Sequence, residues 1–241
     1  MTTLPRIICI EGIDGVGKST VCEHLVGLFT QAGNAVLVVS SPSRDKPVGP
    51  FIRSTILPDT ADDFDPALVG KLFEAAILEN ALDLVFEPDG ITPRSYNEGD
   101  VIILDRWFFT MLTYQQTMGV DVLTNSALSP DEGGLWASVS HLFDRIPEEW
   151  RSLFLRPETY FLENLNTDAV AERLRSLPGR RDKVETSGPD VLAEYQVAYR
   201  YVFGWWANLT APDDFKWFPV DTDQDAVDIA LSIFLCIKHD G

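Results

Sequence analysis

The 241-residue sequence is poor in basic residues, with 19 lysines and arginines against 37 aspartates and glutamates, for a formal net charge of −18. A nucleic-acid partner calls for a basic face, so this balance argues against one, and we read the charge as a heavily solvated acidic surface. No apolar run reaches the roughly 20 residues of a membrane-spanning helix, so we also expect no membrane partner. The sequence contains no repeats and no low-complexity tract.

Cysteine is scarce as well. Cys9, Cys22 and Cys236 are odd in number, and their spacing fits no metal site. Each falls on a predicted core element, so we expect reduced, buried thiols in a cytoplasmic protein. We expect the first apolar run to be a strand of the fold rather than a leader. With 45% apolar residues, we expect the chain to form a single domain over residues 1–241.

The most informative stretch is a glycine-rich turn between an apolar run at residues 6–11 and a helical pattern at residues 18–32. Residues 12–19, hereafter the phosphate loop, fit G-x-x-x-x-G-K-[ST]. The three glycines allow a tight turn that brings backbone N–H groups against phosphate oxygens. The N-terminus of the following helix favours the same anion. The loop therefore predicts binding of a nucleoside triphosphate.

Side chains of the expected type accompany this loop. Lys18 supplies a charge for the β- and γ-phosphates, and Ser19 supplies a hydroxyl for Mg²⁺. The apolar run at residues 101–105 ends in Asp105, which is the usual place for a carboxylate near that ion. The predicted metal ligands are therefore Ser19 and Asp105. The predicted ATP-binding residues are Gly12, Asp14, Gly15, Val16, Gly17, Lys18, Ser19 and Thr20.

Alternating strand and helix patterns predict an α/β fold of the P-loop NTPase type: three layers, with a five-stranded parallel sheet flanked by helices. The predicted strands are residues 6–11, 35–40, 101–105, 158–163 and 215–220, with the second expected to be buried. The predicted helices are residues 18–32, about 49–57, 67–86, 107–118, 189–209 and 225–238. A further helix after residue 163 is expected to be capped by Thr167 or Asp168.

Two segments are expected to be additions to this core. Residues from about 119 to 156 read as a helical insert with its own apolar face. Residues from about 176 to 188 form a basic loop with Arg180 and Arg181 in an acidic protein. That loop is either a solvated surface loop or a lid whose arginines close over the triphosphate, and we favour the lid.

Further candidates lie in a loop and on a helix. Arg44 follows the second strand, where open α/β sheets bind ligands, although a solvated loop arginine would read the same. Phe73, Ile77 and Asn80 share one face of the predicted helix 67–86. Phe73 could be plain core packing, whereas a buried Asn80 needs hydrogen-bond partners.

With these residues in place, the chain resembles the thymidylate kinase family of nucleoside monophosphate kinases nearly end to end. The segments that carry the resemblance are Glu11–Thr20, Ser41–Arg44, Leu72–Phe73, Asp105–Trp107, Tyr114–Gln115, Arg180–Glu185 and Phe218–Asp221. The resemblance implies that Asp14 contacts the sugar 3′-hydroxyl of the acceptor, that Arg44 meets the acceptor phosphate, and that Phe73 stacks on the base.

The resemblance also implies an activity: transfer of the ATP γ-phosphoryl to a deoxynucleoside 5′-monophosphate, above all dTMP, with Mg²⁺ as cofactor and a homodimer as the assembly. The substrate-binding residues that the resemblance implies are Asp14, Arg44, Phe73, Ile77, Asn80, Arg106, Tyr114 and Gln115. The catalytic residues that it implies are Lys18, Asp14, Arg106, Arg180 and Arg181.

A variant in the phosphate loop bears on the lid, and two departures from the family pattern, at Ile77 and Met111, leave the base open. Gly15 stands where some members carry an arginine, and those with another residue there carry the catalytic arginine on the lid. Ile77 replaces the arginine that usually reads thymine, and Met111 stands where an asparagine or a small residue is common.

Two other readings therefore remain. One is a kinase for another or modified nucleotide or base, as in virus-encoded relatives. The other is a nucleotide-binding protein without turnover, which the full set of Lys18, Ser19, Asp105, Arg106 and lid arginines argues against.

Overall fold

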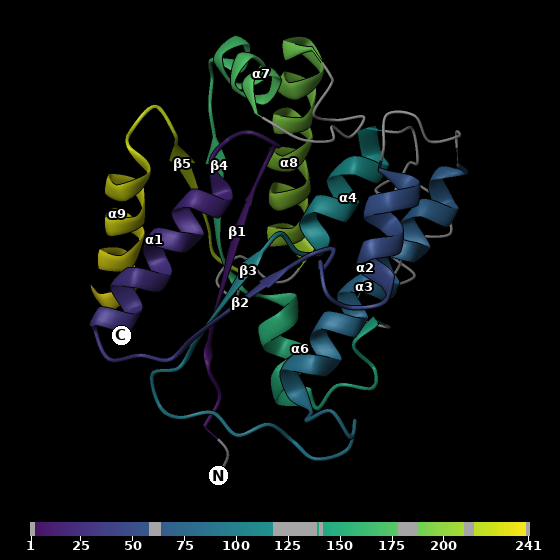
Figure 1. Cartoon of the computed structure of the whole chain (residues 1–241), viewed down its shortest axis with the longest axis vertical. Coiled ribbons are helices and arrows are strands. Elements are labelled where there is room, and N and C mark those ends of the chain that lie inside the picture. Colours follow the sequence, from purple (N-terminus) through teal and green to yellow (C-terminus); the bar gives the residue numbers. More distant parts are fainter. Residues whose placement is uncertain are drawn as a thin grey trace.

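The computed structural model of the chain describes residues 3–57, 64–117, 139, 142–177, 188–209 and 215–239. They form a three-layer α/β structure around a five-stranded sheet (Figure 1). The strands are β1 (Arg6–Gly12), β2 (Val36–Ser40), β3 (Val101–Asp105), β4 (Glu158–Glu163) and β5 (Trp217–Asp221). Their order is β2-β3-β1-β4-β5, and every neighbouring pair is parallel. The predicted parallel sheet of five strands is confirmed.

Strand position in the sheet decides strand burial. The central strands are covered on both faces, so Ile8 and Ile10 of β1 and Leu104 of β3 are fully buried. At the edge, Leu37 and Val38 of β2 are 42% and 40% exposed. The prediction that the second strand is buried is wrong, because a short apolar run reads the same at an edge as in the centre.

Helices cover both faces of the sheet. They are α1 (Lys18–Gln31), α2 (Val48–Phe51), the π-helix η1 (Ile52–Ile56), α3 (Pro66–Val85), α4 (Phe108–Thr117), α6 (Glu148–Leu155), α7 (Thr167–Ser176), α8 (Pro189–Leu209) and α9 (Ala226–His239). On one side α1 packs on α9, with the Phe29 and Phe234 rings 5.0 Å apart, and α3, α4 and α8 lie on the other (Figure 1). In the described part of the chain, no helix is long and apolar enough to cross a membrane.

The C-terminal part of the predicted insert packs into the main core. Trp150 and Phe154 of α6 are buried, and the Phe154 ring lies 5.6 Å from that of Trp107, just after β3. The Trp107 indole N–H donates to the Phe154 carbonyl oxygen at 3.0 Å. This apolar face of α6 therefore belongs to the main core. Residues 119–138, 140 and 141 of the predicted insert lie outside the described residues.

The cap of α7 differs from the prediction. Asn166, rather than Thr167 or Asp168, precedes the first helical turn, and its side-chain oxygen accepts the Ala169 N–H at 3.1 Å. All of these residue types suit an N-cap, so the chain direction after β4 decides which one takes the position.

The cysteines are free thiols in two different environments. Cys9 and Cys22 are buried, as predicted, but Cys236 is exposed. The expectation of a third buried thiol is wrong because α9 packs on α1 through one face and turns the other to solvent.

Candidate functional site

The phosphate loop occupies the turn from β1 to α1, at the carboxyl edge of the sheet (Figure 1). Its three glycines have φ values of +145°, +75° and +104° at Gly12, Gly15 and Gly17. Side-chain-bearing residues rarely adopt such values. A β-carbon on Gly12 would also lie 2.3 Å from the Leu162 carbonyl oxygen. The glycines are therefore needed both for the backbone path and for close packing against β4.

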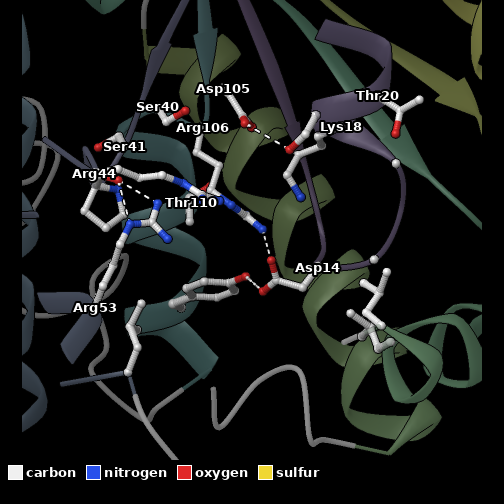
Figure 2. Close-up of a pocket in the computed structure, with 18 of the residues that line it drawn as sticks. Asp14, Lys18, Thr20, Ser40, Ser41, Arg44, Arg53, Asp105, Arg106 and Thr110 are labelled. Atoms are coloured by element: carbon white, nitrogen blue, oxygen red, sulfur yellow. Dashed lines mark hydrogen bonds and ion pairs between the residues drawn. The ribbon is translucent and has the colours of Figure 1, made fainter. Parts of the chain in front are cut away.

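A cavity of about 380 Å³ opens beside this loop (Figure 2). It is lined by five cationic side chains, Lys18, Arg44, Arg53, Arg106 and Arg173, and by two carboxylates, Asp14 and Asp105. In a protein with a net charge of −18, this local excess of positive charge marks the cavity as a site for anions.

The cations are spread along the cavity rather than gathered at one point. Figure 2 shows Arg44 and Arg53 on one side, Lys18 on the other, and Arg106 between them. The Arg53 guanidinium donates to the Pro42 carbonyl oxygen at 2.7 Å and so braces the loop that carries Arg44. The cavity thus offers two separate anion-binding ends joined by Arg106.

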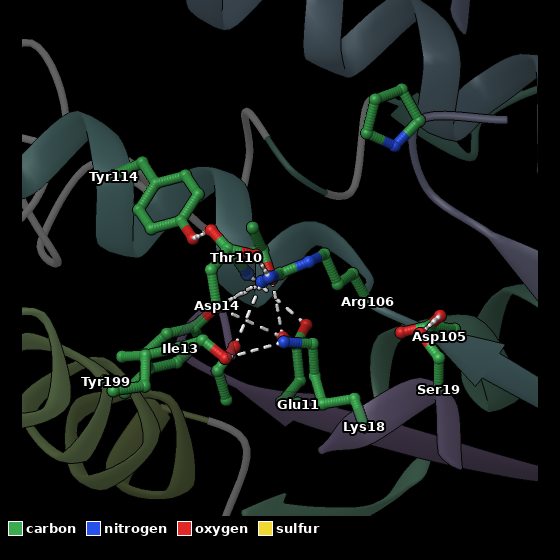
Figure 3. A network of polar contacts seen from close by, with 12 residues as sticks. Glu11, Ile13, Asp14, Lys18, Ser19, Asp105, Arg106, Thr110, Tyr114 and Tyr199 are labelled. Carbon is green, nitrogen blue, oxygen red and sulfur yellow. Dashed lines mark hydrogen bonds and ion pairs between the residues drawn. The ribbon is translucent and has the colours of Figure 1, made fainter. Parts of the chain in front are cut away.

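Arg106 is held by a network that reaches three elements (Figure 3). Its guanidinium forms an ion pair with Asp14 and donates to the Gly12 carbonyl oxygen at 3.0 Å. Asp14 also accepts the Tyr114 hydroxyl at 2.9 Å. Burial alone would raise the pKa of Asp14, but the charges of Arg106 and Lys18 lower it overall, so Asp14 is a carboxylate at neutral pH.

Lys18 is 7% exposed and donates to the Ile13 carbonyl oxygen at 2.7 Å. Burial, helped by the nearby charge of Arg106, lowers the pKa of Lys18 to about 8. An anion in the cavity would favour the ammonium form, because an opposite charge stabilises it. Lys18 is therefore charged at neutral pH but titrates close above it.

The two predicted metal ligands lie together. The Ser19 hydroxyl donates to Asp105 Oδ2 at 3.3 Å, across the gap between α1 and the end of β3. A hydroxyl and a carboxylate suit Mg²⁺, which usually takes one or two protein oxygens and fills its other positions with phosphate and water. No cluster of three or more His, Cys, Asp or Glu occurs among the described residues, so the pair fits that ion only in company with a phosphate ligand.

Most predicted contact residues line the cavity. Of the phosphate loop and its helix, Asp14, Gly15, Gly17, Lys18, Ser19 and Thr20 do so, whereas Gly12 and Val16 lie behind them. On the acceptor side, Arg44, Phe73, Arg106 and Tyr114 line it. Arg180 and Arg181, the predicted lid arginines, lie outside the described residues.

Ile77, Asn80 and Gln115 do not line the cavity. Ile77 and Asn80 are fully buried, and the Asn80 side-chain N–H donates to the Ser40 carbonyl oxygen at 3.1 Å. The Gln115 side chain packs against Gly70 of α3. The shared helix face runs from the cavity wall at Phe73 into the core, so one and two turns further along it no longer faces the cavity.

Other lining and supporting residues were not expected. Arg53 comes from η1, Thr110 from α4 and Arg173 from α7, where its guanidinium lies 3.6 Å from the place of a β-carbon on Gly17. No sequence pattern marked Arg53 or Thr110. The signal for Arg173 was only a basic residue near the predicted lid.

Part of this chain matches a known protein family. The sequence profile described as thymidylate kinase matches residues 10–137, just over half of the chain. The chain belongs to the thymidylate kinase family. That match includes the phosphate loop, Arg44, Phe73 and the turn at Arg106, which are the elements that build the cavity.

Individual relatives of this chain are named as probable thymidylate kinases. The chain is 34% identical over 130 residues to the probable thymidylate kinase of Thermococcus kodakarensis, covering 52% of this chain and 62% of that one. It is 35% identical over 115 residues to the probable thymidylate kinase of Pyrococcus horikoshii, covering 48% and 54%. The alignments thus span about half to three-fifths of these relatives.

A solved structure extends the likeness to the whole fold. The thymidylate kinase of Candida albicans superposes with a TM-score of 0.64 and 17% identity, over 98% of this chain and 92% of that one. This match places the chain in the P-loop NTPase fold type.

Proposed function

We propose that this protein transfers the γ-phosphoryl group of ATP to the 5′-phosphate of a deoxynucleoside monophosphate, with dTMP as one acceptor. The observation that carries the proposal is the cavity with two anion-binding ends joined by Arg106 (Figure 2). One end suits the triphosphate, against the phosphate loop and Lys18. The other suits a monophosphate, against Arg44 and Arg53. Family membership supports the same reaction.

The reaction needs little from the protein beyond placement and charge. An oxygen of the acceptor phosphate attacks the γ-phosphorus, and the bond from that phosphorus to the β,γ-bridging oxygen breaks, leaving ADP and a nucleoside diphosphate. The acceptor phosphate is already ionised near neutral pH, so no general base is required. Lys18 and Arg106 hold the charge that moves between the two phosphates, and Asp14 orients Arg106.

Mg²⁺, held by Ser19 and Asp105 with the phosphates, would neutralise charge on the triphosphate. We further propose that Arg180 and Arg181 close over the triphosphate as a lid. The remaining expectations for this chain are a homodimer and a cytoplasmic location.

A second candidate, a kinase for a different or modified base, is favoured by one observation. Among the described residues, Phe73 is the one residue of α3 that lines the cavity, and the lining contains no asparagine or glutamine. A site that does not hydrogen-bond the base edge discriminates poorly between bases. We therefore propose that dTMP is accepted but with weaker preference than a thymine-reading arginine would give.

The test is a coupled assay of ADP release with ATP, Mg²⁺ and each common ribo- and deoxynucleoside monophosphate. We expect turnover with dTMP and at least one other deoxynucleotide, and loss of at least roughly 100-fold in kcat for Lys18→Ala. Nucleotide binding without any ADP release would instead support a binding protein without turnover.

A further inference from the structure

A buried carboxylate beside the site has no part in the proposed reaction. Glu11, the penultimate residue of β1, is fully buried and does not line the cavity. Its Oε1 accepts the backbone N–H groups of Trp107 at 2.8 Å and Thr110 at 3.3 Å. Its Oε2 accepts the hydroxyls of Thr110 at 2.5 Å and Tyr199 at 3.3 Å (Figure 3).

All four partners can donate to the carboxylate, and the two backbone N–H groups can do nothing else, so the arrangement suits an ionised Glu11. Burial raises the pKa of Glu11 above its usual value, and the Thr110 hydroxyl, the charge of Arg106 and the Trp107 N–H offset this only in part.

The Glu11 carboxylate holds the backbone of a strained turn at Arg106. Arg106 has φ of +70°, a left-handed conformation that residues other than glycine adopt only where their surroundings enforce it. Three successive residues of β1 supply that enforcement. Ile10 accepts the Arg106 N–H at 3.1 Å, Glu11 accepts the Trp107 N–H, and Gly12 accepts the Arg106 guanidinium. Of the three residues of β1, only Glu11 acts through its own side chain, so only its contact can be removed by a substitution in β1.

The second oxygen of Glu11 acts on the guanidinium through two hydroxyls. Arg106 Nη1 donates to Thr110 Oγ1 at 3.4 Å and to the Tyr199 hydroxyl oxygen at 3.3 Å. Because the Thr110 proton points to Glu11, its lone pairs are left to receive Arg106. Removing the negative charge would free that proton to turn toward Arg106 and repel it.

We propose that Glu11 is a positioning residue for Arg106. One carboxylate fixes both the backbone of the strained turn and the hydroxyl oxygens that orient the guanidinium between the two phosphates. The inference rests on the proposed phosphoryl transfer, because it assigns Glu11 a role through the cation that bridges the donor and acceptor ends of the cavity.

The decisive variant is Glu11→Gln, which keeps the size of the side chain but replaces one acceptor oxygen by a donor. We expect kcat to fall about 10-fold and the KM for dTMP to rise, while the KM for ATP stays unchanged because Lys18 and Ser19 are untouched. Tyr199→Phe is the matched control. It removes one hydroxyl from the same carboxylate and with it one acceptor of Arg106, but it leaves Thr110 and both backbone hydrogen bonds, and should have a smaller effect.

A merely structural role predicts a different result. Partial unfolding lowers the active fraction and therefore kcat, but it moves neither KM. We would abandon the proposal if Glu11→Gln lowered kcat only in proportion to the folded fraction measured by circular dichroism, with both KM values unchanged.

A double-mutant cycle with Arg106→Ala separates the routes of action. If Glu11 acts through Arg106, Glu11→Gln causes no further loss of kcat/KM in the Arg106→Ala protein; additive losses would refute the inference. The same cycle is measured on dTMP binding by titration calorimetry. A wild-type protein that binds dTMP without turnover would refute the proposed reaction, while the cycle on binding still decides the role of Glu11.

Discussion

Gly15 gives a sharp test of how the phosphate loop is packed. Its φ is +75°, and a β-carbon there would lie 2.7 Å from Leu174 Cγ and 3.2 Å from Val170 Cγ1, both on α7. Gly15→Ala should therefore be destabilising for two separate reasons, the backbone conformation and the collision with α7.

The chain offers a control that carries only the first penalty. Gly90 has φ of +70°, but a β-carbon there would meet nothing within 4 Å. We expect Gly90→Ala to lower the free energy of unfolding by about 1 kcal/mol, the cost of a left-handed alanine. Gly15→Ala should lose about 1–3 kcal/mol more, the usual cost of overpacking a core.

The assay is equilibrium unfolding in urea for wild type, both alanine variants, Leu174→Ala and the Gly15→Ala/Leu174→Ala double variant. Truncating Leu174 removes the closest contact and leaves only the 3.2 Å approach to Val170 Cγ1, so the loss for Gly15→Ala should then fall close to that for Gly90→Ala. Equal losses for Gly15→Ala and Gly90→Ala in the wild-type background would show that α7 does not press on the phosphate loop as described.

Three further predictions concern charge and the base. The pKa of Lys18 is about 8, and bound phosphate should raise it, so ATP should bind with proton uptake near pH 8–9 and with lower affinity above about pH 8. Calorimetry of ATP binding in two buffers measures the proton uptake, and finding none would contradict this prediction. Changing Arg180 and Arg181 to Ala should lower kcat with a modest change in acceptor KM, and an effect on acceptor KM alone would argue against a lid. Asn80→Ala should lower the free energy of unfolding by about 1–3 kcal/mol, because it removes a buried hydrogen bond. It should leave the ratios of kcat/KM among dTMP, dUMP, dCMP, dGMP and dAMP unchanged, and altered ratios would place the Asn80 amide at the base.

The sequence determined the parts whose chemistry is local. The phosphate loop is one contiguous stretch in which glycine, Lys18 and Ser19 serve the same anion, so its position and conformation could be read directly. Asp105 could also be placed beside Ser19 without a structure, because parallel strands end at the same edge of their sheet. The central strands could be predicted from the sequence because a strand that is covered on both faces is a nearly continuous apolar run.

What only the tertiary structure decided depends on partners far apart in the chain. In the sequence Glu11 is only the last residue of a predicted strand, yet its hydroxyl partner Tyr199 lies 188 positions away. Arg53 becomes a cavity residue only when η1 folds against the loop at Pro42, and Asn80 is withdrawn because its helix enters the core. Periodicity shows which residues share a face of a helix, but the packing of that helix decides where the face is aimed and how deep each residue lies.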